Sequence, residues 1–114
     1  MKKTLLLMIT LGLFSCKHND SSLPYTKVYK SDSSIQCEST GIALDAMAME
    51  LVNAGIDVVC AQKGDDGLTR ITVCGAGTGI INVYTIHASN LVDAQALGFN
   101  PVSELSEYQD QECK

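Results

Sequence analysis

The sequence predicts an α+β domain, with one or two helices on one face of a small, mostly antiparallel sheet of three to four strands, stapled by disulfides. Three observations predict this class. Apolar residues recur at helical spacing in residues 41–55, the runs 56–62, 68–74 and 80–86 are rich in β-branched residues, and the cysteines suit disulfide pairing. Helical and strand patterns within one short chain favour a single core between a sheet and its helices.

A helix is expected in the segment GIALDAMAMELVNAG, residues 41–55. Ser39 or Thr40 can cap its first turn, because a side-chain hydroxyl accepts hydrogen bonds from the free amides there. Gly55 can adopt the left-handed conformation that ends a helix, with Ile56 packing back on the last turn. The predicted apolar face of this helix consists of Leu44, Met47, Ala48, Leu51 and Val52.

Strands are expected at residues 56–62 and 68–74, where β-branched side chains flank a turn. Asp66 and Gly67 form a turn pair that favours a hairpin between these two strands. Residues 35–37 are expected to form a further short strand before the helix.

The segment GAGTG, residues 75–79, precedes the third expected strand at 80–86. Because a strand and not a helix follows these glycines, they predict a tight turn and not a phosphate-binding loop. A short helix is expected at 91–97, where Gly98 and Phe99 repeat the glycine and apolar closure of the first helix.

The first fifteen residues have the layout of a secretory signal. Lys2 and Lys3 precede an apolar run at 5–14, and the small residue Ser15 stands just before Cys16. The apolar run is about half the roughly 20 residues that a membrane-spanning helix needs. We therefore expect export, with removal of the leader.

Leu13, Phe14, Ser15 and Cys16 read LFSC, which resembles the lipobox of bacterial lipoproteins. The resemblance implies cleavage before Cys16, diacylation of its sulfur and acylation of the new amino terminus, with palmitate as a typical chain. Anchoring by more than one acyl chain is stable. Lys17 is not the aspartate of an inner-membrane retention signal, so the resemblance favours the outer membrane, facing the periplasm or the cell surface. The alternative is an ordinary cleaved signal followed by an incidental cysteine.

The rest of the chain is expected to form a flexible tether at 16–34, one α+β domain at 35–105 and an acidic polar tail at 106–114. The tether is predicted from its polar composition, which has no sustained period. Without the two leader lysines, six basic residues face thirteen acidic ones, a formal charge of −7. This balance argues against a nucleic-acid partner, whose phosphates attract a basic surface.

Assigning Cys16 to lipid leaves an even set of cysteines, which an exported chain is expected to oxidise to disulfides. The first expectation pairs Cys60 with Cys74 across the hairpin and Cys37 with Cys113 at the tail. Pairing of Cys37 with Cys74 or with Cys60 is the open alternative.

No cofactor is predicted, and no metal site, because the cysteines and the two histidines are too far apart in sequence. His87, Ser89 and Asp93 are residue types of a hydrolytic triad, although Ser89 is better explained as a helix cap. We therefore expect a non-enzymatic, lipid-anchored binding module whose partner is another envelope protein or peptidoglycan. A small envelope hydrolase using His87, an inhibitor of an exported hydrolase and a purely structural envelope protein are the alternatives.

Overall fold

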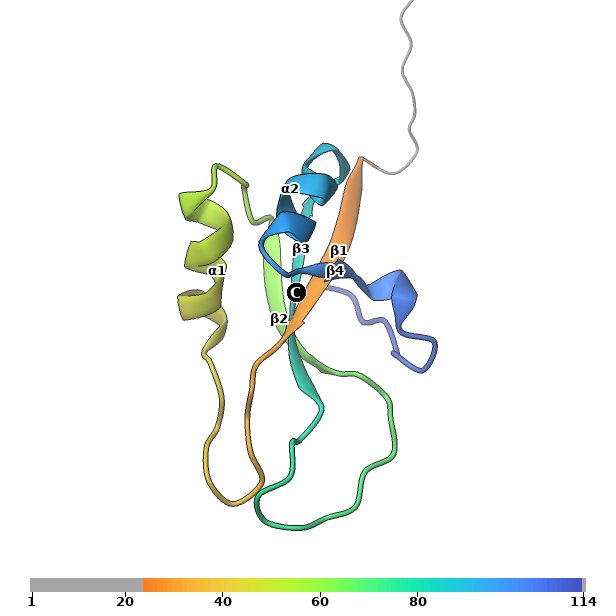
Figure 1. Cartoon of the computed structure of the whole chain (residues 1–114). Coiled ribbons are helices and arrows are strands. Elements are labelled where there is room, and N and C mark those ends of the chain that lie inside the picture. Colours follow the sequence, from red (N-terminus) through yellow and green to blue (C-terminus); the bar gives the residue numbers. More distant parts are fainter. Residues whose placement is uncertain (1–23, 114) are drawn as a thin grey trace, which may run out of the picture.

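Four antiparallel strands and two helices form the described part of the chain, residues 24–113 of a computed structural model (Figure 1). The elements are β1 (Tyr25–Ser31), α1 (Leu44–Asn53), β2 (Cys60–Asp65), β3 (Ile80–His87), α2 (Leu91–Ala96) and β4 (Asn100–Pro101). The sheet has the order β2-β3-β1-β4. With this order of elements, two βαβ units interleave in one sheet, which is the split βαβ arrangement.

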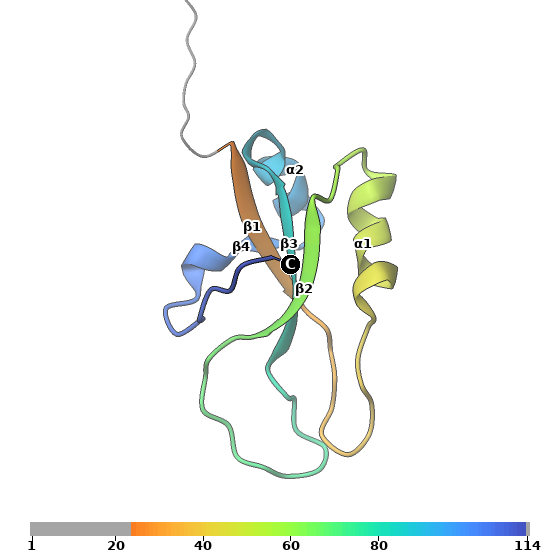
Figure 2. The same cartoon turned by 180° about the vertical axis from the view of Figure 1, so that it is seen from behind.

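Both helices pack on one face of the sheet, and the C-terminal segment crosses the opposite face (Figures 1 and 2). This arrangement confirms the predicted α+β class. No helix within residues 24–113 is long and apolar enough to cross a membrane. The core between helices and sheet consists of Val28, Met47, Leu51, Ile56, Tyr84, Ile86, Ala94 and Phe99.

The two helices end in the same way, as the sequence predicts. In α1, Gly55 has φ +84°, and the Ile56 N–H donates to the Leu51 carbonyl at 3.0 Å. In α2, Gly98 has φ +97°, and the Phe99 N–H donates to the Ala94 carbonyl at 3.0 Å. These bonds define Schellman motifs, whose apolar residue after the glycine returns to the core.

The start of α1 and one residue of its predicted face differ from expectation. The helix begins at Leu44 after Ala43, with no side-chain cap. The Ser39 hydroxyl accepts a hydrogen bond from the Ile35 N–H at 3.3 Å, so it serves the preceding turn instead of the helix. Val52 is 48% exposed, because it lies at the edge of the packed face and not within it.

The predicted tether at 16–34 is wrong for its second half, because β1 lies in the middle of the sheet between β3 and β4. Its lysines are typical of a solvent-exposed segment, which favours the tether prediction. On the helix face, the Lys30 ammonium pairs with Glu50 at 2.8 Å and lies 4.9 Å from the centroid of the Phe99 ring. Long basic side chains can cover apolar surface while their charged ends remain paired or solvated.

The predicted strand at 68–74 is also wrong. β2 pairs directly with β3 through Asp65 and Ile80, and the residues between them form a long excursion that we call the distal loop, residues 66–79 (Figure 1). Residues 35–37 form a turn and not a strand, with Cys37 at φ +70°.

The predicted pairing of Cys60 with Cys74 and of Cys37 with Cys113 is wrong. Cys37 pairs with Cys74, with Cα atoms 5.1 Å apart, and Cys60 pairs with Cys113 at 6.2 Å. Cys74 cannot face Cys60 because the distal loop carries it away from β2. The pair of Cys37 with Cys74 is one of the two alternatives that the sequence leaves open.

The segment from Leu105 to Cys113, which we call the C-terminal strap, is held against the sheet and includes the described part of the predicted acidic tail at 106–114. Its Asp110 accepts a hydrogen bond from Lys27 at 2.8 Å. Tyr108 lies against Gly64, where a glycine leaves room for the ring beside Val83.

The described residues do not include the predicted leader, Cys16, Lys17 or His18.

Candidate functional site

A cavity of about 530 Å³ lies between the sheet and the distal loop, and we call it the distal cavity. It is found at the Ser31 end of β1, away from Tyr25 at the other end of the same strand. Ser33 and Leu68 at its rim are exposed, whereas Ile81 at its floor is 2% exposed. The volume falls within the range of small-molecule sites.

The hydroxyls of Ser34 and Thr78 line the distal cavity on the side that we call its wall. Ser34 Oγ and Thr78 Oγ1 hydrogen-bond to each other, which joins the segment after β1 to the distal loop. The Ile80 N–H donates to Thr78 Oγ1 at 3.0 Å. The Ser34 N–H donates to Asp32 Oδ1 at 2.8 Å, so the wall is fixed to a carboxylate behind it.

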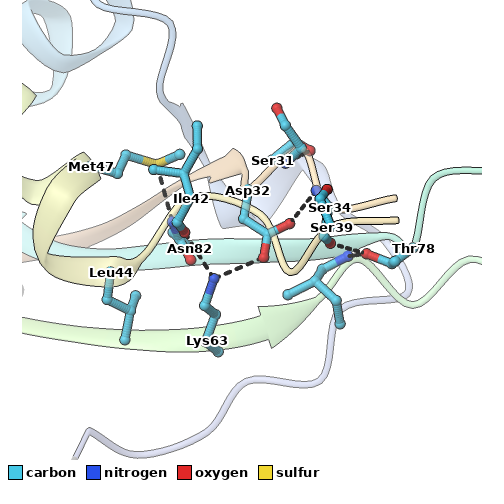
Figure 3. Close-up of polar contacts among 12 residues, drawn as sticks. Ser31, Asp32, Ser34, Ser39, Ile42, Leu44, Met47, Lys63, Thr78 and Asn82 are labelled. Carbon is cyan, nitrogen blue, oxygen red and sulfur yellow. Dashed lines mark hydrogen bonds and ion pairs between the residues drawn. The ribbon is translucent and has the colours of Figure 1, made fainter. Parts of the chain in front are cut away.

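Asp32 is 1% exposed and anchors this wall from within the domain. Its Oδ2 lies 2.8 Å from Nζ of Lys63, which is part of β2 (Figure 3). Burial alone would raise the pKa of Asp32, but hydrogen bonds from Lys63 and Ser34 outweigh it and hold the pKa below its ordinary value. Gly41, at φ +83°, permits this close packing because an added Cβ would lie 2.6 Å from the Asp32 carboxyl carbon.

Asn82 extends the same polar group toward the core (Figure 3). The Ile42 carbonyl accepts hydrogen bonds from Asn82 Nδ2 and from Lys63 Nζ, both at 3.0 Å. Asn82 Nδ2 also lies 3.4 Å from the Met47 sulfur. The turn before α1 is therefore tied to β2 and β3.

An ion pair forms the distal side of the cavity. Arg70 donates to both carboxylate oxygens of Asp66, at 2.8 and 2.7 Å, and Asp66 also accepts the Leu68 N–H at 3.0 Å. The hydrogen bonds from Arg70 lower the pKa of Asp66, although burial opposes them. The pair packs over Gly79, where an added Cβ would lie 2.5 Å from Arg70 Nη1. Both charges are thus balanced within the protein.

Two other polar groups at the distal cavity are uncommitted. Within residues 24–113, the Tyr29 hydroxyl and the Ser33 hydroxyl take part in no hydrogen bond to another residue. Burial raises the pKa of Tyr29, and the negative charges of Glu104 and Asp66 add to this increase. The cavity therefore offers neutral hydroxyls in a slightly negative environment.

Gln36 holds the distal loop in addition to the disulfide, the Ser34–Thr78 hydrogen bond and the Arg70–Asp66 ion pair. The Gln36 amide donates to the carbonyls of Ile71 and Gly77, both at 3.1 Å, and its oxygen accepts the Val73 N–H at 2.8 Å. This clamp leaves apolar side chains outside, with Ile71 76% exposed. The loop is ordered by these hydrogen bonds and its disulfide and not by burial of its apolar side chains.

His87 lies far along the sheet from the distal cavity. Its ring centroid is 5.0 Å from that of Tyr25, with which it pairs across β1 and β3. Within the described residues, no hydrogen bond joins the His87 imidazole to Ser89 or Asp93, so the structure does not assemble these three as a hydrogen-bonded set. No group of three potential metal ligands occurs within residues 24–113.

A second hollow of about 350 Å³ lies beside Lys27 and Asp110. Its one cationic group is already bonded to the C-terminal strap, because Lys27 Nζ also donates to the Gln111 carbonyl at 2.7 Å. The distal cavity is the larger of these two hollows, at about 530 Å³, and is therefore the better candidate site.

The residues of the distal cavity were missed in the sequence because they lie in segments assigned to a tether, a strand and a turn. The segment SDSS at 31–34 was the available signal, since it places three hydroxyls and one carboxylate within four positions. Asp66, the carboxylate that lines the cavity, is engaged by Arg70, and Asp32 behind the wall is engaged by Lys63. No family model matches the chain, and comparison with curated proteins and with solved structures found no match either.

Proposed function

We propose that the chain is an exported, lipid-anchored binding protein of a bacterial envelope, with Cys16 as the lipidated residue and the distal cavity as the binding site. The supporting observation is the placement of the cavity at the Ser31 end of β1, whereas Cys16 precedes the Tyr25 end in the sequence. An anchor at Cys16 would leave the cavity on the side of the domain away from the membrane.

The cysteine pairing supports the same proposal. The two disulfides use four of the five cysteines, which leaves Cys16 for a different role. Disulfides persist in exported proteins and are rare in the reducing cytosol. A lipid on Cys16 accounts for the odd cysteine.

The anchor is tested by expressing the full chain in a diderm bacterium fed an alkyne-labelled palmitate. We expect the label on the wild-type chain and its loss in Cys16→Ser, because the sulfur is the acceptor. Cys37→Ser, which removes a disulfide cysteine, is the matched control and should keep the label. Label on Cys16→Ser, or none on the wild-type chain, would contradict the proposed anchor.

The binding role is tested by placing a photocrosslinking amino acid at one of two equally exposed sites in the same cells. Ile71 on the distal loop is 76% exposed, and Val92 on α2 is 75% exposed at the other end of the domain. We expect specific crosslinked products from Ile71 and not from Val92. Identical patterns from the two sites, or no product from either, would contradict a binding end at the distal loop.

The clamp on the distal loop favours a second candidate, an inhibitor of an exported hydrolase. A loop held by Gln36 and the Cys37–Cys74 disulfide is already ordered before binding, and such preorganisation lowers the entropy lost on association. This candidate predicts inhibition of an exported protease in a panel assay, with a weaker effect for Gln36→Ala. Inhibition that is unchanged in Gln36→Ala would count against it.

A further inference from the structure

We infer that the distal cavity binds a short, uncharged segment of a glycan, with Tyr29 and Ser33 as its hydrogen-bonding residues. This inference rests on the proposed binding role of the cavity and gives that role a ligand class. It follows from three properties of the cavity: the kind of polar group left uncommitted, the charge balance and the apolar floor.

The uncommitted groups are hydroxyls, and a hydroxyl both donates and accepts hydrogen bonds. Tyr29 and Ser33 therefore match a ligand whose own polar groups have the same double capacity, as ring hydroxyls do. Ser33 lies at φ +63°, which fixes its backbone at the rim, and its N–H is already bonded to Ser31 Oγ at 3.0 Å. The side chain is the part of Ser33 that remains available.

The charge balance disfavours ionic ligands. An anion would need a cation to spare, but Arg70 is engaged by both oxygens of Asp66. A ligand cation would need an available carboxylate in the lining, but the carboxylate that lines the cavity, Asp66, already accepts from Arg70 and Leu68, and Asp32 is buried behind the wall. An uncharged ligand leaves these pairs intact, whereas breaking them would expose charges without partners.

Apolar surface lies beneath the hydroxyls. Ile81 forms the floor, and the ring of Tyr29 and the side chains of Leu68 and Leu105 border it. A pyranose ring has C–H faces as well as hydroxyl edges, so it can pack on such a floor while its edges bond to the rim. The volume of about 530 Å³ admits a small oligosaccharide and not a folded partner.

The inference is tested by NMR titration of the ¹⁵N-labelled, disulfide-bonded chain carrying Cys16→Ser, with chitotetraose, maltotetraose and trigalacturonate as probes. We expect saturable shifts at the amides of Ser33, Ser34 and Thr78 with an uncharged probe and none with trigalacturonate. Preference for chitotetraose would indicate an N-acetylated glycan as the source, and preference for maltotetraose a plain glucan. No saturable shift with either uncharged probe, or equal binding of trigalacturonate, would overturn the inference.

A matched pair of variants locates the site. Tyr29→Phe keeps the ring and removes the hydroxyl, and we expect it to weaken glycan binding about fivefold, as loss of one hydrogen bond does. Tyr25→Phe makes the same change at the opposite end of β1 and should leave affinity unchanged. Ser33→Gly, which suits the positive φ, should weaken binding to a similar extent as Tyr29→Phe. Equal affinities for Tyr29→Phe and Tyr25→Phe would overturn the assignment of the site.

The outcomes also separate this inference from the proposed function. Specific crosslinking from Ile71 without glycan binding would mean that the distal end binds a protein, which overturns the glycan inference and keeps the binding role. Glycan binding in vitro without palmitate on Cys16 would keep the ligand class and overturn the anchor.

Discussion

Asp32 is the residue on which the wall of the distal cavity most depends. It accepts hydrogen bonds from the Ser34 N–H and from Lys63, and its backbone carbonyl accepts the Ile42 N–H at 2.7 Å. These contacts join β1, β2 and the turn before α1. A buried carboxylate is stable only when donors replace its lost water, and each of these donors would in turn be left unpaired without it.

Replacement of the Asp32 carboxylate should therefore destabilise the domain. We expect Asp32→Asn to lower the free energy of unfolding by about 2 kcal/mol, because an amide nitrogen would face a donor where an oxygen accepted before. Urea denaturation with intact disulfides measures this loss. Asp57→Asn, at an exposed position after α1, is the control and should change stability little. Equal losses in the two variants would show that the Asp32 contacts contribute nothing.

The depressed pKa values of Asp32 and Asp66 also predict how stability depends on pH. Hydrogen bonds from Lys63 and Ser34 overcome the burial of Asp32, and hydrogen bonds from Arg70 lower the pKa of Asp66. A carboxylate whose pKa is lower when folded stabilises the protein above its unfolded pKa of about 3.9 and loses this contribution as the pH falls through the folded value.

We therefore expect the free energy of unfolding to be nearly constant from about pH 5 to 7 and to fall below about pH 4. Urea denaturation across pH 2–7 checks this, and Asp32→Asn should make the acid fall shallower. A fall in Asp32→Asn as steep as in the wild-type chain would contradict the assignment to this carboxylate.

At the scale of single residues, the sequence shows which residue types are present but not which side chains contact one another. It identifies Gly55 and Gly98 as helix ends because the bonds that require them lie within a few residues. It does not identify Asp32 as buried, since Lys63 lies 31 positions further along the chain. Tyr29 and Ser33 escape notice for the same reason, because only the folded distal loop makes them part of a cavity.

The C-terminal strap is an element that depends on a glycine in the distal loop. Gly67 has φ +83°, and an added Cβ there would collide with the Glu107 carbonyl of the strap. Gly55, at φ +84°, has no atom within 4 Å of such a Cβ. The two glycines have the same backbone conformation but different surroundings.

Alanine substitution at these two glycines therefore tests how the C-terminal strap packs on the distal loop. Gly55→Ala should cost about 1 kcal/mol, because an L side chain is strained at positive φ. Gly67→Ala should cost about 1 to 3 kcal/mol more, since the added methyl group must displace the strap. Urea denaturation of both variants measures the difference. Losses of equal size would contradict close packing of the strap on the loop.

Elements with a local pattern were predicted, and elements defined by distant contacts were not. The helices α1 and α2 and the strand β3 follow from spacing and β-branched composition. The strand β1 is central, yet its polar composition without a sustained period predicts a tether. Its Lys27 and Lys30 bond to Asp110 and Glu50, which lie 83 and 20 positions away. Residues 68–74 have strand composition but no partner strand.

The whole molecule is held by two disulfides that close long loops. Cys37 and Cys74 are separated by 37 positions, and Cys60 and Cys113 by 53. Restricting the unfolded chain over loops of this length contributes about 4 kcal/mol each. The second disulfide also fixes the C-terminal strap over Ile81 and Val83, so the two have different structural consequences.

Removal of each pair should separate these roles. We expect each of the two double variants to lower the free energy of unfolding by about 4 kcal/mol. These are Cys37→Ser with Cys74→Ser, and Cys60→Ser with Cys113→Ser. The second pair alone should increase binding of a hydrophobic dye under native conditions, because a released strap uncovers the sheet face. Dye binding that rises equally in both double variants would contradict a covering role for the strap.

The fold class was predictable for the whole molecule, whereas the strand order and the disulfide pairing were not. The class depends on composition and periodicity along the chain. The order β2-β3-β1-β4 depends on which strands meet, and the excursion of the distal loop moved Cys74 from the expected Cys60 to Cys37. Local patterns contain no information on that excursion, because Gln36 and Ser34 bond to loop residues that lie 35 to 44 positions away.

The intact mass of the chain purified from bacterial membranes, alkylated before and after reduction, tests the central claim most directly. We expect a chain that begins at Cys16, carries acyl groups and reacts with alkylating reagent only after reduction, at Cys37, Cys60, Cys74 and Cys113. A chain that still begins at Met1, or thiols that react before reduction, would contradict both the anchor and the disulfides.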